Sequence, residues 1–236
     1  MTGGSRGIGR ATAQRFAAEG DTVVVGARRA EDVTSAVEAI SAAGGRASGW
    51  TVDVADAHDV EVFFARIVDE VGVPEVGVLS AGLGHWSPVH EMTDEYWHQT
   101  MRVNVDGAFF CTRAFLRVRD GRRGGHLVYL SSVMGSRGVP NMAAYAASKA
   151  AVATLADSVA REVKSQATKV TVISPGTTST GMREHQHGRP QTPDVTEFDL
   201  QLRPEDVADA IFWAASASAH AFPTSVVVEP PGAPAR

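Results

Sequence analysis

Cysteine is nearly absent from this sequence, since Cys111 is the only one among 236 residues. One thiol excludes an internal disulfide and a metal site built from several cysteines, and it fits a reducing compartment. We interpret Cys111 as a buried apolar residue. His185 and His187 form a His-x-His pair, but no Cys/His cluster accompanies them, so we expect no metal site.

Long apolar runs and an excess of positive charge are also missing. No apolar run reaches the roughly 20 residues that cross a bilayer, and the polar, glycine-rich start is unlike a signal peptide. The formal net charge of -5 disfavours nucleic acid and acidic membranes as partners. We therefore expect a cytoplasmic protein that binds neither.

The residues that are present suit one α/β domain over residues 1–236. Hydrophobic residues make up 44% and charged residues 21%, which allows a sizeable core. Short apolar stretches rich in β-branched residues alternate with helical patterns. Strands are predicted over residues 22–27, 46–54, 76–80, 126–132, 169–174 and 225–229. Helices are predicted near Gly7, after the first strand, from Asp56, over about 93–119, over 143–165 and from Pro204.

This alternation predicts right-handed βαβ units and a doubly wound parallel sheet between two helical layers, three layers in all. The stretch over about 177–202 has no clear periodicity and is rich in His, Thr and Pro. A loop of that length is usually functional or mobile, and we interpret it as a substrate loop.

The opening stretch TGGSRGIGR has the composition of a phosphate-binding turn. Gly3, Gly7 and Gly9 allow a tight turn and a close approach to a pyrophosphate, and a helix that opens near Gly7 presents free N–H groups. The alternative is a glycine-rich start without consequence. The βαβ order downstream favours the nucleotide site.

The strand over 22–27 ends at Ala27-Arg28-Arg29, where an NAD site usually places a carboxylate. Ala27 has no carboxylate to repel a 2′-phosphate, and Arg28 is suited to bind one, with Arg6 as a second contact. NADP(H) is therefore the preferred cofactor, and NAD(H) is possible. The alternative is that these arginines are solvated surface charges.

Four polar residues form a candidate catalytic group. Tyr145 and Lys149 lie four residues apart in a predicted helix and share a face. A nearby ammonium lowers the pKa of a tyrosine, which suits acid–base work. Ser132 ends a predicted strand and can hydrogen-bond a carbonyl oxygen. Asn104 lies between valines in a predicted helix and can hold a water for proton relay.

With these residues, the sequence resembles the classical short-chain dehydrogenase/reductase family over nearly its whole length. TGGSRGIG, Asp53-Val54, the Asn104/Ser132/Tyr145/Lys149 set and PGTTST at 175–180 match the family's motifs in order. The resemblance implies a Rossmann-like fold. It implies cofactor contacts from Thr2, Gly3, Ser5, Arg6, Gly7, Ile8, Gly9, Arg28, Asp53, Val54, Ala81, Gly82, Tyr145, Lys149, Pro175, Gly176, Thr178 and Thr180.

The resemblance also implies how the residues act on a small-molecule carbonyl or alcohol. Tyr145 is the general acid in reduction and the base in oxidation. Lys149 lowers the pKa of Tyr145 and holds the nicotinamide ribose, Ser132 polarises the carbonyl, and Asn104 supports a water-linked proton path. His85, Trp86 and Met182 are candidate substrate contacts, although packing roles are open for them. A homodimer or homotetramer is expected.

Two departures from the family pattern concern single motifs. The family's Asn-Asn-Ala-Gly is Leu79-Ser80-Ala81-Gly82 here, which predicts weaker cofactor positioning. The glycine-rich C-terminal finish is replaced by PTSVVVEPPGAPAR, so the usual subunit contact there is in doubt.

A third departure is the family's first strand, which normally precedes the glycine turn and is central in a sheet ordered 3-2-1-4-5-6. We expect a start assigned too late, because relatives read Val-Thr-Gly-Gly here and a GTG valine codon can be mistaken for an initiator. The alternative is a shortened protein. Two other functions also stay open: a non-catalytic or inactive nucleotide-binding relative, and an epimerase or dehydratase that reuses the Tyr/Lys pair.

Overall fold

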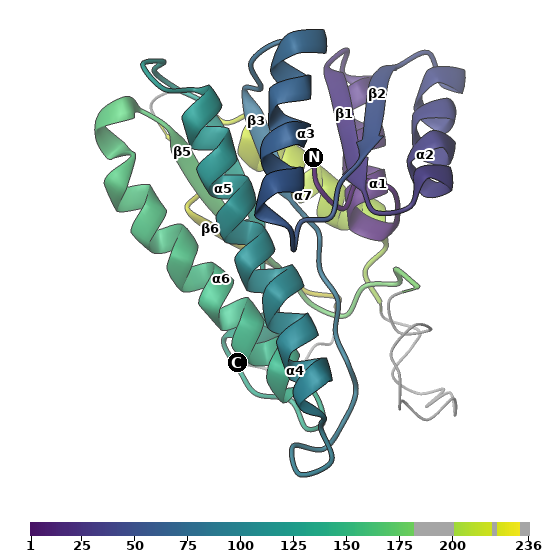
Figure 1. Cartoon of the computed structure of the whole chain (residues 1–236), viewed down its shortest axis with the longest axis vertical. Helices are drawn as coiled ribbons and strands as arrows, with labels where there is room; N and C mark the ends of the chain where they lie inside the picture. The colour runs from purple at the N-terminus through teal and green to yellow at the C-terminus, as the bar shows by residue number, and fades with distance from the viewer. Residues whose placement is uncertain (182–200, 219–220, 232–236) are drawn as a thin grey trace.

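The computed structural model describes residues 1–181, 201–218 and 221–231. In that part of the chain, strands and helices alternate as predicted (Figure 1). The strands are β1 Thr22–Ala27, β2 Arg46–Thr51, β3 Val76–Leu79, β4 His126–Leu130, β5 Lys169–Pro175 and β6 Ser225–Val228. The α-helices are α1 Gly7–Ala18, α2 Ala30–Ala42, α3 Ala57–Glu70, α4 Asp94–Met101, α5 Gly107–Val118, α6 Ala143–Glu162 and α7 Pro204–Ala215.

All strand pairs are parallel, and they form two adjoining parts in the orders β2-β1 and β3-β4-β5-β6. Thr2 lies between the parts, bridging Gly26 at the end of β1 and Leu79 at the end of β3. Figure 1 shows the N-terminus at this central place. The predicted doubly wound order is confirmed, with Thr2 where the family's first strand would end.

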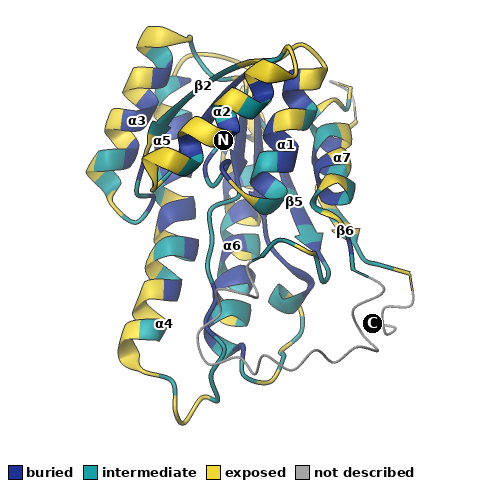
Figure 2. Cartoon of the chain, turned by 90° about the vertical axis from the view of Figure 1, so that its right-hand side faces the viewer, coloured by how far each residue is buried: buried dark blue, intermediate teal, exposed yellow. Residues whose placement is uncertain are grey.

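Helices cover both faces of the sheet, as the burial colours of Figure 2 show. One apolar cluster joins the strands to α1, α2 and α7, with Phe16, Ile40 and Ile211 among its members. The other joins them to α3, α5 and α6, with Phe64 and Phe115 among its members. Because the strands are packed on both faces, they read as continuous apolar runs such as HLVYL. The three-layer α/β architecture is confirmed.

The helix predicted over about 93–119 contains a π-helical turn that the sequence did not indicate. Thr93 caps α4 by accepting a hydrogen bond from the Tyr96 N–H at 3.2 Å. The π turn spans Arg102–Asp106, and α5 follows directly. A π turn holds an extra residue, so it rotates the residues within it relative to a regular helix, and such turns are frequent at functional sites. Asn104 is in this turn.

The strand predicted over 46–54 is shorter in the structure. β2 ends at Thr51, although the Val52 N–H still donates to the Ala27 carbonyl at 2.9 Å. Asp53 then leaves the sheet, and Asp56 caps α3 as predicted by accepting from the N–H groups of His58 and Asp59 at 2.8 and 3.1 Å.

No helix within the described ranges is long and apolar enough to cross a membrane.

Candidate active site

Gly3 and Gly9, in the turn at the start of the chain, leave no room for a side chain. A Cβ on Gly3 would lie 2.6 Å from the Ala81 nitrogen, and one on Gly9 would lie 2.1 Å from the Gly3 carbonyl oxygen. Gly3 and Gly7 also have positive φ angles of 67° and 49°. The predicted need for glycine at these three positions is therefore confirmed by the backbone.

The N-terminus of α1 is open to an anion. α1 begins at Gly7 directly after this turn, and the N-cap Arg6 makes no side-chain hydrogen bond to the helix. The first N–H groups of a helix have no partner within it and carry a partial positive charge. A Cβ on Gly7 would lie 3.0 Å from the Thr180 Cβ, so the loop after β5 borders the turn. This cradle fits a dinucleotide pyrophosphate.

Three arginines lie near the carboxyl end of β1. Arg28 is exposed, which is compatible with a phosphate-binding residue and with a solvated surface charge. Arg29 pairs with Asp32 at 2.7 Å, and the Arg6 guanidinium is 3.7 Å from the same carboxylate. Sequence reasoning missed Asp32, which holds Arg6 and Arg29 together at this end of the sheet.

Asp53 and Val54 follow β2 at the carboxyl end of the strands, beside the end of β1. The Asp53 carboxylate accepts the Ala55 N–H at 3.0 Å, and its own N–H donates to Asp59 at 2.6 Å. Val54 is buried, and a Cβ on Gly107 would lie 2.8 Å from it. The Asp53 side chain is thus fixed where the resemblance implies an adenine contact.

Ser132 and Tyr145 meet beyond the carboxyl end of β4. Ser132 is 8% exposed, its hydroxyl accepts the Met134 N–H at 3.2 Å, and it hydrogen-bonds the Tyr145 hydroxyl. Burial raises the pKa of Tyr145 to about 12, and the hydrogen bond from Ser132 opposes this rise. Two hydroxyls from different elements therefore lie close together beyond this strand end.

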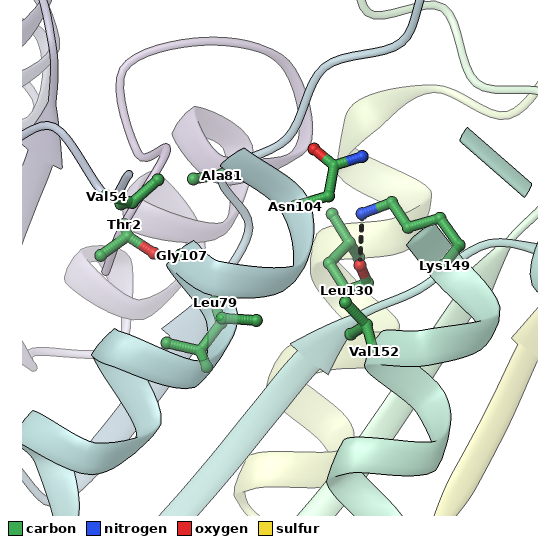
Figure 3. A pocket seen from close by; sticks show the side chains of 10 residues that line it. Thr2, Val54, Leu79, Ala81, Asn104, Gly107, Leu130, Lys149 and Val152 are labelled. Atoms are coloured by element: carbon green, nitrogen blue, oxygen red, sulfur yellow. Dashed lines mark hydrogen bonds between the residues drawn. The ribbon is translucent and has the colours of Figure 1, made fainter. Parts of the chain in front are cut away.

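Lys149 is buried one helical turn after Tyr145. Its ammonium donates to the Leu130 carbonyl at 2.7 Å, shown as the dashed line in Figure 3, and lies 5.6 Å from the centre of the Tyr145 ring. Burial lowers the pKa of Lys149 to about 8. Burial is the largest cause of the Tyr145 pKa shift, and the lowering of this pKa by Lys149 that the resemblance implies stays a prediction.

Asn104 organises the segment that follows β3. Its carboxamide accepts the Leu83 N–H and donates to the Leu83 carbonyl, both at 2.9 Å. It also donates to the Ser148 hydroxyl at 2.9 Å. The Ser148 hydroxyl in turn donates to the Tyr145 carbonyl at 2.7 Å. Asn104 therefore connects α6 to the segment over 81–84.

A small cavity of about 10 Å³ lies among Asn104, Lys149, Ala81 and Thr2 (Figure 3). That is about the smallest volume that holds one water. A Cβ on Gly82 would lie 3.3 Å from both the Asn104 Oδ1 and the Lys149 Nζ. Asn104 and Lys149 therefore line the same cavity, with Gly82 close to both, and their catalytic roles stay predictions.

The departure at Leu79-Ser80 leaves the backbone path intact. Leu79 is a buried core residue, and the Ser80 N–H donates to the Thr2 carbonyl at 3.2 Å. After it, Gly84 lies against Tyr145, since a Cβ there would be 2.9 Å from the Tyr145 Cδ2.

The candidate substrate contacts are only partly described. His85 is buried and stacks on Tyr96 with 4.1 Å between ring centres, and its Nε2 is 2.9 Å from the Gln99 Oε1. It therefore packs against α4, and Trp86 beside it is half-buried. Met182, His185 and His187 lie outside the described residues.

The loop after β5 completes the site. The Gly176 N–H, next to Pro175, donates to the Val228 carbonyl at 2.7 Å, and the Thr178 hydroxyl donates to the Gly176 carbonyl at 3.0 Å. Among the described residues, no group of histidine, cysteine or carboxylate side chains is arranged to hold a metal ion.

Sequence reasoning missed Ser148 and the Leu83 backbone. Ser148 lies between Tyr145 and Lys149 in an alanine-rich helix, and the structure buries it. A small polar residue at that place was the indication in the sequence that its hydroxyl makes a hydrogen bond. Nothing in the sequence pointed to Leu83, since its main-chain groups and not its side chain take part.

A glycine turn at a helix start, in a doubly wound sheet, with polar groups at the strand ends, defines a nucleotide-binding α/β protein. The family model of short chain dehydrogenases matches residues 1–190. The chain therefore belongs to the short-chain dehydrogenase/reductase family of oxidoreductases, and the earlier resemblance is confirmed.

Two curated relatives illustrate the similarity. A 3beta-hydroxysteroid dehydrogenase from Mediterraneibacter gnavus is 38% identical over 185 residues, which are 78% of this chain and 67% of that protein. A 3-oxoacyl-acyl-carrier-protein reductase from Synechocystis sp. is 33% identical over 228 residues, which are 95% and 91% of the two chains.

Solved structures agree with the fold. A metagenomic short-chain oxidoreductase in complex with NADP matches with a TM-score of 0.83 at 29% identity, covering 97% of this chain and 94% of the other. A variant of the actinorhodin polyketide ketoreductase with NADPH matches with a TM-score of 0.88 at 27% identity, covering 96% and 92%.

Proposed function

We propose that this protein is an NADP(H)-dependent oxidoreductase that interconverts a carbonyl group and a secondary alcohol, with Tyr145 as the general acid or base. The observation that carries the proposal is the meeting of the Ser132 and Tyr145 hydroxyls beside the buried Lys149. A module that only binds nucleotides has no need of this group.

The cofactor part of the proposal rests on the glycine turn and the arginines near β1. The turn and the N-terminus of α1 bind the pyrophosphate, and Asp53 contacts the adenine. Arg28, together with Arg6 and Arg29, binds the 2′-phosphate. When bound, the nicotinamide supplies or accepts the hydride at the reacting carbon. The NADP and NADPH complexes of the similar structures support this choice of cofactor.

The proton-transfer part follows from the high pKa of Tyr145. Ser132 donates a hydrogen bond to the carbonyl oxygen and stabilises the negative charge that develops there. Tyr145 gives its proton to that oxygen, and the nearby Lys149 ammonium stabilises the tyrosinate that remains. Because Tyr145 is protonated at neutral pH, reduction is the favoured direction there, and alcohol oxidation becomes faster as pH rises.

Proton resupply to Tyr145 uses the cavity beside Asn104. Lys149 and the Asn104 carboxamide face the same small space, which has room for about one water. Two hydrogen bonds to the Leu83 backbone fix the Asn104 carboxamide beside this space. A water there links Lys149 to the segment over 81–84.

The substrate is a small molecule with a ketone or a secondary alcohol. The hydroxysteroid and 3-oxoacyl relatives both act on such groups by name, which supports this class. We further propose one domain over residues 1–236, a substrate loop over about 177–202, a homodimeric or homotetrameric state and a cytoplasmic location.

The first test is a fluorescence titration of the purified chain with NADPH and then NADH, with the 4 tryptophans as reporters. Saturable binding that prefers NADPH, and that weakens in Arg28→Ala, supports the assignment. Arg161→Ala is the matched control, because Arg161 is an exposed arginine on α6 that pairs with Asp157. Tighter binding of NADH overturns the cofactor assignment.

The second test follows NADPH absorbance with a panel of ketones. Net NADPH consumption with alcohol formation supports the reductase. Turnover without net consumption identifies an epimerase instead. Binding of NADPH with no turnover of any ketone, 3-oxoacyl thioester or steroid identifies a binding protein.

A further inference from the structure

The segment that follows β3 passes directly beside the ring of Tyr145. A Cβ on Gly84 would lie 2.9 Å from the Tyr145 Cδ2 and 3.3 Å from its Cγ. Carbon atoms in ordinary contact lie about 3.5–4.0 Å apart, so a side chain at this position would overlap the ring. The φ angle of Gly84 lies outside the left-handed region, so its backbone conformation is open to other residues. Contact with Tyr145, and not the shape of a turn, therefore requires glycine here.

Hydrogen bonds fix the main chain on both sides of Gly84. The Asn104 carboxamide bonds both the N–H and the carbonyl of Leu83, each at 2.9 Å. On the other side, the Ser87 N–H donates to the Asn141 carbonyl at 2.9 Å. These bonds join the segment to the π turn and to the loop before α6. The backbone of Gly84 therefore has little freedom to move away from the ring.

His85 anchors the same segment through its side chain. It is 7% exposed, and its ring lies parallel to that of Tyr96, with 4.1 Å between the centres and 5° between the planes. The His85 Nε2 is also 2.9 Å from the Gln99 Oε1. Both partners belong to α4, so His85 packs against that helix. A buried side chain thus holds the neighbouring Gly84 in place, in addition to the backbone bonds.

The position of the Tyr145 ring determines where its hydroxyl lies. That hydroxyl is hydrogen-bonded to Ser132, and the Lys149 ammonium lies 5.6 Å from the ring centre. A phenol ring is rigid, so a push at its Cδ2 also moves the hydroxyl at its far end. A misplacement of about 1 Å can cost a catalytic group about 100-fold in rate.

We propose that Gly84 is a positioning residue for the reaction, because the absence of a side chain there allows the Tyr145 ring to lie where its hydroxyl meets Ser132. The inference rests on the proposed function of Tyr145 as the general acid or base. The next nearest atom, the Met142 Cε, would lie 3.4 Å from the added Cβ, which is an ordinary contact. A methyl group at residue 84 therefore acts on Tyr145.

The kinetic test compares Gly84→Ala with Gly138→Ala, a control in which the new Cβ meets nothing within 4 Å. We expect kcat for carbonyl reduction to fall by about 10–100-fold in Gly84→Ala only. KM for the ketone and Kd for NADPH should stay near those of the parent. The solvent deuterium isotope effect on kcat should rise, because proton transfer from the displaced hydroxyl becomes the slow step. A raised KM with the kcat of the parent would overturn the proposal, since Gly84 would then only leave room for substrate.

A double-mutant cycle tests the same contact without turnover. Gly84→Ala should lower the melting temperature of the parent by roughly 2–8 °C. In the Tyr145→Ala background it should change the melting temperature little, because the ring that it would overlap is gone. A loss of the same size in both backgrounds contradicts the proposal.

The cycle also covers a variant that does not fold. If Gly84→Ala gives no folded parent chain, folding of the Tyr145→Ala/Gly84→Ala double variant supports the contact with the ring, and its failure to fold overturns the proposal. A protein that reduces no ketone but shows the expected cycle would mean that the proposed function is wrong and that the contact is real. The two failures are therefore distinguishable.

Discussion

At the scale of single residues, the proposed chemistry rests on the hydroxyl of Tyr145. We predict that Tyr145→Phe lowers kcat/KM for carbonyl reduction by about 10²–10⁴-fold, because the substrate oxygen loses its proton donor. NADPH affinity should stay near that of the parent, since the substitution leaves the glycine turn and the arginines unchanged. Steady-state kinetics and the fluorescence titration measure the two quantities separately.

Tyr129→Phe is the matched control for loss of a tyrosine hydroxyl. The Tyr129 hydroxyl is buried in the core and lies 2.7 Å from the Thr112 Oγ1, away from Ser132. This variant should lose roughly 1 kcal/mol of unfolding free energy and keep its turnover. Parent-like kcat in Tyr145→Phe would show that another group is the acid.

Lys149 is predicted to lower stability while it supports activity. Its pKa falls from 10.5 to about 8 on folding, so the unfolded chain holds this proton more tightly. The folded state therefore bears the full cost below pH 8, and stability recovers as pH rises from 8 to 10.5. We predict that Lys149→Met raises the unfolding free energy at pH 7 by about 1–3 kcal/mol, after the lost hydrogen bond to Leu130 is counted.

Urea unfolding at pH 7 and pH 10 measures this difference between Lys149→Met and the parent. The gap should narrow at the higher pH, and reductase activity should be lost in the variant at both. A variant that is less stable than the parent at both pH values would mean that the Lys149 hydrogen bond outweighs the desolvation.

At the scale of elements, the glycine turn and α1 act as one unit. Alanine normally stabilises a helix relative to glycine by up to about 1 kcal/mol. At Gly9, however, a Cβ would lie 2.1 Å from the Gly3 carbonyl oxygen. We predict that Gly9→Ala abolishes NADPH binding and lowers the unfolding free energy by about 1–3 kcal/mol.

Gly138→Ala is the control for that substitution, because a Cβ there meets nothing within 4 Å. Thermal unfolding measures the stability of both variants, and NADPH titration measures their cofactor binding. Tight NADPH binding by Gly9→Ala would show that the turn adapts to a side chain and does not cradle the pyrophosphate closely.

The elements also show which features a sequence reveals. The glycine turn and the Tyr145/Lys149 pair were predictable, because each depends on residues close together in the chain. The π turn at Arg102–Asp106 was not, since the helical pattern continues through it. The Asn104 side chain contacts the main chain of Leu83, 21 residues away. Every residue type has these main-chain groups, so the sequence could not indicate the contact. The contact of Arg6 with Asp32 likewise depends on how α1 and α2 pack.

At the scale of the whole molecule, the proposed cofactor site spans the two parts of the sheet. The arginines and the glycine turn lie beside β1, whereas Ser132 and Lys149 belong to the β3–β6 part. In the described ranges, Met1 and Thr2 make the backbone hydrogen bonds between the parts. Helix packing adds to this connection, since the Phe16 ring of α1 meets the Phe212 ring of α7 edge-on at 5.1 Å.

This arrangement predicts that the two parts of the sheet differ in local stability and that cofactor binding raises the local stability of both. Without NADPH, amides of β1 and β2 should exchange faster than those of β4, whose residues Leu127 to Tyr129 are fully buried. NADPH at 100 times its Kd should slow exchange in both parts by up to about 100-fold, because a ligand that contacts both must leave before either opens. Hydrogen exchange with and without NADPH, with NADH as the control, measures this. Protection confined to β1 and β2 would mean that the nicotinamide end of the cofactor does not reach Lys149. The catalytic role proposed for Tyr145 and Lys149 would then be wrong.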